Sequence, residues 1–212
     1  AKTDDIERLE FELKTGDVTN KMLNDPDTGY LNRKGSAARG SSSDAQQGFA
    51  EYRKTVLATA SKTNRAKLAA FLDEREHALL GTVTASERRE TEAERKRLLG
   101  NSVVITRDGA IAGYDPEREP NPAAKARIRI RRRLVKLHPE AEPEEIERRV
   151  AAEMSRIHEG IITGLADGGQ GAAGKAYLAR AMANNGIAAG RVAGLQALTD
   201  TAAIDEESLA SF

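Results

Sequence analysis

Apolar residues recur every three or four positions along highly charged stretches, and this spacing constrains the fold more than any other feature. The cleanest run consists of Ile146, Val150, Met154, Ile157, Ile161 and Leu165. A shorter run precedes it and consists of Ala126, Ile130, Leu134 and Leu137. Such spacing places the apolar side chains on one face of a helix. The sequence therefore predicts an all-α fold, either an elongated multi-helix bundle or an irregular helical array.

The composition predicts a thin core. Only 4% of the 212 residues are aromatic and Trp is absent, so Leu, Ile, Val and Ala must fill the interior. Thin cores suit elongated bundles or chains that pack against neighbours. Lys and Arg together number 33, as do Asp and Glu, which argues against a globally basic nucleic-acid binder. The lack of cysteine excludes disulfides and thiolate metal sites.

Three parts are expected along the chain: N-terminal helices and a loop (1–43), long charged helices (44–115), and a C-terminal helical bundle (116–212). Ile6, Leu9 and Leu13 share one face of the first helix. Asp4 with Glu7, and Thr84 with Glu87, have capping-box spacing and predict helix starts. Because the chain begins at Ala1 without Met, we expect a piece of a longer or processed polypeptide.

Glycines and a possible hairpin interrupt the predicted helices of the middle part. Gly81 and Gly100 are expected to break or end a helix. Val103 to Thr106 and Ala110 to Tyr114 flank an Asp-Gly turn, which allows one short β-hairpin. Arg39 to Ser43 is expected to be coil.

The sequence GQGAAGKA, at 169–176, partly fits a phosphate-binding loop. It has the required glycines and Lys175, but Ala176 stands where Ser or Thr should bind magnesium. It also follows a predicted helix, whereas a phosphate-binding loop follows a strand. We interpret it as a turn between helices and expect no cofactor.

The segment at 25–36 partly fits a calcium loop. Asp25 and Asp27 have the alternating spacing, but Gly29 and Ser36 stand where further ligands are needed. An Asp-Pro turn is the favoured interpretation, and no metal is expected.

The segment KARIRIRRRLVK concentrates positive charge. Its cations are Lys125, Arg127, Arg129, Arg131, Arg132, Arg133 and Lys136. Such a helix can contact phosphates, so a helical nucleic-acid-contacting module is one alternative function. Five glutamates between 140 and 147 follow directly. In the competing interpretation, two antiparallel helices neutralise each other.

Two sets of glycines are spaced by four residues, at 160, 164 and 168, and at 186, 190 and 194. This spacing lets helices approach closely. We expect subunit contacts at Gly160, Gly164, Gly186, Gly190 and Gly194. Tight packing within the chain, or simple helix breaks, is the competing interpretation.

Catalysis has little support in the sequence. The three histidines, His77, His138 and His158, lie far apart, and no serine lies in a recognisable nucleophile turn. No pair of carboxylates stands out as a glycosidase pair. We expect no catalytic residues, and a packed structural role for His158.

The stretch NDPDTGYLNRKGSAA resembles a segment of the internal virion, or ejection, proteins of tailed bacteriophages. The matching positions are Asp25, Pro26, Asp27, Thr28, Gly29, Tyr30, Leu31, Asn32 and Gly35. Residues 158–169 and 172–187 are similar in style, around Ala176, Tyr177 and Leu178. The chain departs from the family pattern because no clear helix is predicted directly after Gly35.

The resemblance implies a structural protein that oligomerises into a conduit for genome delivery across the host envelope. It implies a homo-oligomer, other virion or ejection proteins as partners, and contact with genomic DNA and the host envelope. The expected location is the virion, then the host periplasm or envelope. Some family members carry a peptidoglycan-cleaving domain elsewhere, so part of a muralytic virion enzyme is a further alternative.

The residues of the 25–35 loop also suit a role in assembly on physical grounds. Gly29 and Gly35 allow backbone angles that other residues resist, and Pro26 stiffens the entry. Tyr30 and Leu31 then form an apolar pair suited to docking on a neighbouring subunit. Alternatively, this pair fixes the loop to the chain's own core.

Overall fold

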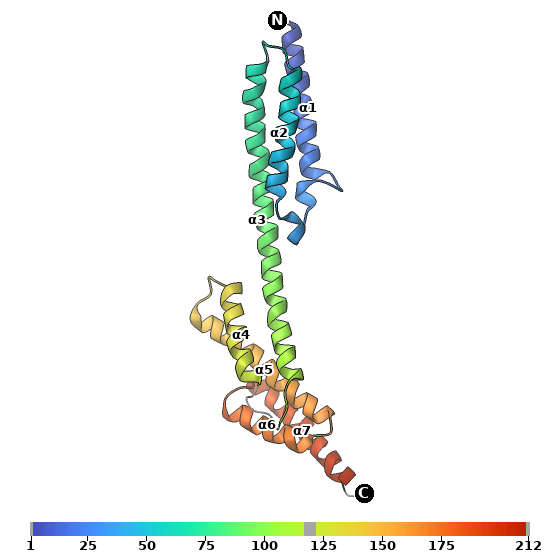
Figure 1. Cartoon of the computed structure of the whole chain (residues 1–212). Helices are drawn as coiled ribbons and strands as arrows, with labels where there is room; N and C mark the ends of the chain where they lie inside the picture. Colours follow the sequence, from blue (N-terminus) through green and yellow to red (C-terminus); the bar gives the residue numbers. More distant parts are fainter. Residues whose placement is uncertain (1, 117–121, 211–212) are drawn as a thin grey trace. The chain divides into compact units, whose positions relative to one another are not determined.

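A computed structural model describes residues 2–116 and 122–210, and every regular element within these ranges is a helix (Figure 1). The all-α prediction is therefore confirmed. The chain divides into two compact units, Ala1–Arg95 and Lys96–Phe212. The three-part division at 43/44 and 115/116 stays a prediction.

The N-terminal unit consists of three helices that lie side by side in Figure 1. They are α1 (Lys2–Asn24), α2 (Ser41–Thr59) and the first part of α3 (Arg65–Ala112). The buried cluster between them consists of Ala45, Phe49, Val56, Leu72, Leu79 and Val83. Phe49 packs edge-on against Tyr52, with 5.9 Å between the ring centroids. This core is mainly aliphatic, as the composition requires.

The segment between α1 and α2 is more ordered than the predicted Gly/Pro loop. It contains two short 3₁₀ helices, Tyr30–Asn32 and Gly35–Ala38. Gly40 has φ +81°, a left-handed angle that favours glycine, and α2 begins directly after it at Ser41. The predicted coil at 39–43 is thus wrong from Ser41 onward.

Helix α3 corrects three predictions. It runs without interruption from Arg65 to Ala112, so neither Gly81 nor Gly100 breaks a helix. The possible hairpin at 103–114 is also wrong, because Val103 and Ala110 are buried on one face of α3. One glycine costs a helix only about 1 kcal/mol. The packing of helix residues on both sides therefore outweighs this local cost.

The C-terminal unit is arranged around α5 (Pro143–Asp167). This helix packs against α4 (Pro122–Leu137), α6 (Gly171–Ala183) and α7 (Ala189–Ala210). The predicted stripe of α5 is confirmed, and its buried members are Ile146, Val150, Met154, Ile157, Ile161 and Leu165. Pro143 is the first residue of the helix, where its missing N–H leaves no bond unmade.

Helices α6 and α7 approach closely because two glycines of α6 face α7. A Cβ atom at Gly171 would overlap backbone atoms of Ala202 and Ala203. A Cβ atom at Gly174 would lie 3.2 Å from Cγ2 of the buried Thr199. Small residues in GQGAAGKA therefore serve helix packing.

We expect Gly171→Ala to destabilise the protein by about 1–3 kcal/mol, because overpacking a close contact forces the backbone apart. Gly194→Ala is the control, since a Cβ atom there meets nothing within 4 Å. The control should be neutral or stabilising by up to about 1 kcal/mol. Urea unfolding followed by circular dichroism measures both changes. Equal stability of the two variants would contradict the close approach.

Candidate functional site

Asp25 organises the turn that follows α1. Its Oδ1 accepts hydrogen bonds from the backbone N–H groups of Asp27 and Thr28, at 3.1 and 2.9 Å, and from the Thr28 hydroxyl at 2.8 Å. The Thr28 N–H is the largest cause of the lowered pKa of Asp25. These bonds form the Asp-Pro turn that the sequence favours over a calcium loop.

Gly29 and Asn32 close the same turn. A Cβ atom at Gly29 would lie 2.5 Å from the carbonyl oxygen of Asp25, so only glycine fits without a backbone shift. The Asn32 side-chain amide donates a hydrogen bond to that oxygen at 2.8 Å. The motif residues Asp25, Thr28, Gly29 and Asn32 therefore build one local structure.

Tyr30 and Leu31 have different surroundings. Tyr30 packs against the core of the N-terminal unit, and burial raises the pKa of its hydroxyl. The guanidinium of Arg33 lies 4.7 Å from the centre of its ring and binds Asp44 at 2.6 Å. Leu31 is half-buried and lies outside that core cluster. These contacts favour the intrachain role for Tyr30; the subunit-contact role of both residues stays a prediction.

Glu87 of α3 holds the beginning of α2. Its carboxylate accepts hydrogen bonds from the N–H groups of Gly40 and Ser42, at 2.7 and 2.9 Å, and from the Ser42 hydroxyl at 2.5 Å. The Ser42 hydroxyl is the largest cause of the lowered pKa of Glu87. One turn further along α3, Glu90 binds Lys34 and the N–H of Gly35.

Glu7 of α1 holds the turn between α2 and α3 through similar hydrogen bonds. It accepts hydrogen bonds from the N–H and hydroxyl of Ser61, at 2.9 and 2.6 Å, and from the Asn64 side chain at 2.7 Å. The predicted capping boxes of Glu7 and Glu87 are wrong, because both residues lie inside helices and cap other segments. No local sequence pattern indicates such caps.

The seven cations of α4 fall into two sets. Arg127 and Arg131 both bind Glu147 of α5, and Arg133 donates to the Thr106 hydroxyl. Arg131 is the largest cause of the lowered pKa of Glu147. The second set has no ion pair or hydrogen bond among the described residues and consists of Lys125, Arg129, Arg132 and Lys136. The structure therefore supports neutralisation by α5 for Arg127 and Arg131, and nucleic-acid contact by the second set stays a prediction.

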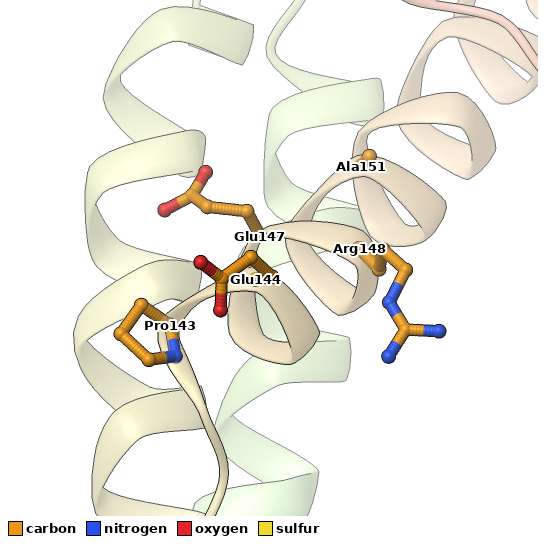
Figure 2. Close-up of a pocket in the computed structure, with 5 residues that line it drawn as sticks. All are labelled: Pro143, Glu144, Glu147, Arg148 and Ala151. Carbon is orange, nitrogen blue, oxygen red and sulfur yellow. The ribbon is translucent and has the colours of Figure 1, made fainter.

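A shallow hollow lies beside these ion pairs. It has a volume of about 440 Å³ and is lined by Pro143, Glu144, Glu147, Arg148 and Ala151. Figure 2 shows the two carboxylates on one side of α5 and Arg148 on the other. All the lining residues belong to α5, and Glu147 is already bound by two arginines. The hollow therefore offers a helix surface rather than an enclosed site.

The predicted glycine contacts also divide into two groups. A Cβ atom at Gly160 would lie 2.5 Å from Ile111, and one at Gly186 would lie 2.9 Å from His158. These two glycines thus serve packing inside the unit. A Cβ atom at Gly164, Gly190 or Gly194 would meet nothing within 4 Å, and these positions are exposed.

The remaining candidate residues, Lys175 and His158, make contacts within the fold. Lys175 of GQGAAGKA binds Asp200 at 3.0 Å. The predicted turn between helices is correct only for Gly169 and Gln170, because α6 begins at Gly171 and contains the rest of the motif. His158 Nδ1 lies 2.8 Å from the Tyr177 hydroxyl, and burial lowers the pKa of this histidine. Across 2–116 and 122–210, no three His, Asp or Glu side chains gather as metal ligands.

Neither protein-family models, nor curated proteins, nor solved structures give a match to this chain. Among the helices described, none combines the length and apolar character that crossing a membrane requires.

We expect the stability of the N-terminal unit to depend on pH through Glu87. Because its folded-state pKa lies below the ordinary 4.5, its stabilising contribution is complete above that pH. The contribution is lost as pH falls through the lowered pKa. Glu87→Gln should therefore lower the melting temperature at neutral pH and weaken its dependence on acid.

Melting curves from about pH 7 to pH 3 measure this effect. Glu74→Gln is the control, because Glu74 is exposed on the same helix and no described residue bonds to its carboxylate. This variant should keep the acid dependence of the unmodified chain. Identical curves for both variants would show that the cap contributes nothing.

Proposed function

We propose that this chain is a helical structural segment of a tailed-phage internal virion, or ejection, protein. It oligomerises into a conduit for genome delivery across the host envelope. An all-α chain, located in the virion and later in the host periplasm or envelope, suits this role. Other virion or ejection proteins and genomic DNA are its expected partners.

The observation that carries the proposal is the structure of the 25–35 motif. Residues that carry the phage resemblance, among them Asp25, Thr28, Gly29 and Asn32, make the bonds that define one turn between α1 and α2. The motif is thus a built element of the fold. The residues that carry the resemblance therefore build one element of this fold, and this supports their reading as a structural motif.

The packing of the chain is compatible with assembly. Its cores consist mainly of aliphatic residues, and large apolar side chains remain exposed on several helices. Exposed apolar side chains that lie together on one helix face mark interaction surfaces. A protein built to associate with copies of itself has this character.

Mass photometry and cryo-EM of the purified chain, with and without detergent, test the proposal. We expect uniform rings or tubes. Leu31→Asp should weaken assembly about tenfold, because a lost apolar anchor costs over 1 kcal/mol. Ala37→Asp, at an exposed position of the same segment, should assemble normally. A compact stable monomer at high concentration would contradict the proposal.

A further inference from the structure

The outward side of α4 carries its free cations in one narrow stripe. Lys125, Arg129, Arg132 and Lys136 follow one another at intervals of four, three and four residues, which places them on one side of a helix. All four are exposed, and within 2–116 and 122–210 the structure gives none of them an ion pair or hydrogen bond. The stripe extends over about 16.5 Å of the helix axis.

An apolar strip lies directly beside these cations. Ile128 is 57% exposed and Val135 is 46% exposed. Ile128 lies three residues after Lys125 and four before Arg132, and Val135 lies three after Arg132, so they are neighbours on the helix surface. The four cations and these two apolar residues together form the basic-apolar face of α4.

Packing fixes the rotation of α4 that exposes this face. The opposite side is buried in the core of the C-terminal unit, where Ile130 is fully covered. Arg131 binds Glu147 of α5 on one flank, and Arg133 donates to the Thr106 hydroxyl of α3 on the other. Because these three sides are held, α4 cannot turn its free cations toward carboxylates of its own unit.

The carboxylates near α4 do not cancel its charge. Five glutamates lie between 140 and 147, in the turn after α4 and at the start of α5. Residues 122–149 carry nine lysines and arginines against these five glutamates, a net charge of +4, whereas the whole chain has no net charge. An anionic surface would therefore attract this region more than the rest of the chain.

We propose that α4 lies on the surface of an anionic lipid bilayer through its basic-apolar face. Lipid phosphates bind the four cations, and Ile128 and Val135 enter the boundary between headgroups and acyl chains. The long side chains of lysine and arginine reach the headgroups from beside this apolar pair. The proposal rests on the proposed function for the membrane concerned, the host envelope, and names the surface that binds it.

The combination of cations and apolar side chains selects a membrane. A nucleic-acid backbone would neutralise the cations but would leave Ile128 and Val135 without an apolar partner. A second copy of this chain offers no match through the exposed apolar stripe of α1, because Glu10 and Asp17 alternate there with two lysines. A basic amphipathic surface is typical of helices that lie on membranes, and an anionic bilayer satisfies both of its parts.

Co-sedimentation of the purified chain with lipid vesicles tests the proposal. The anionic vesicles contain phosphatidylglycerol and phosphatidylethanolamine, and the neutral ones contain phosphatidylcholine. We expect binding to the anionic vesicles that weakens in added salt, and binding to the neutral vesicles that is weaker by about tenfold or more. Equal binding to both kinds of vesicle, or binding to neither, would overturn the proposal.

Lysine variants test the charged part of the face. Lys125→Ala with Lys136→Ala should weaken binding to anionic vesicles by about tenfold or more, because each cation near such a surface strengthens binding several-fold. Lys54→Ala with Lys67→Ala is the matched control, since it removes two exposed lysines from the N-terminal unit, and it should leave binding unchanged. Equal losses in the two variants would reduce the effect to net charge and overturn the assignment to α4.

Uncharged polar variants test the apolar part. Ile128→Asn with Val135→Asn keeps every charge and should weaken binding to anionic vesicles about tenfold, because apolar burial at the interface is lost. Circular dichroism checks that the variant is folded. Unchanged vesicle binding by this folded variant would overturn insertion of the apolar pair.

Two further measurements separate the remaining outcomes. If the chain binds duplex DNA but no anionic vesicles, and the Lys125→Ala and Lys136→Ala variant loses the DNA, the face belongs to nucleic acid and the membrane proposal is overturned. Mass photometry without lipid measures assembly independently of vesicle binding. Rings or tubes that bind no vesicles would leave the proposed conduit standing without this contact, whereas a monomer that binds vesicles as described would support the contact and contradict the conduit.

Discussion

A chain that is almost entirely helical must satisfy the free N–H groups at the start of each helix. Here residues of other helices supply some of the acceptors, such as Glu87 at the start of α2 and Glu206 at the start of α6. Glu7 of α1 binds the turn before α3, and Glu87 of α3 binds the start of α2. Each carboxylate thus fixes both a connection and the register of two helices. Packing of small aliphatic side chains alone would define that register poorly.

The helical class follows from sequence because apolar spacing acts within one helix, as the buried stripe of α5 shows. The secondary-structure predictions failed where packing between helices outweighed the local preference of the sequence for a strand or a turn. Val103 to Thr106 favours a strand and Asp108–Gly109 favours a turn, yet burial of Val103 and Ala110 keeps α3 helical. Glycines likewise predict breaks, yet Gly81 and Gly100 lie inside α3, whereas Gly40 and Gly168 border helices.

The candidate surfaces are predictable only in part. The turn at Asp25 could be expected, because its bonds span few residues. The roles of Glu7 and Glu87 could not, because they depend on which turns of separate helices lie opposite. The charge of α4 is plain in the sequence, but only the packing of α5 shows that Glu147 occupies two of its arginines.

The glycine that closes the turn has an evolutionary consequence. A side chain at Gly29 would collide with the backbone of Asp25. A substitution there therefore disturbs folding, whatever partner the protein binds. The motif can thus persist in descendants whose assemblies have diverged. The outward faces of α1 and α4 carry no such constraint, because side chains such as Ile6, Leu13 and Ile128 are exposed there and substitutions cost the fold little.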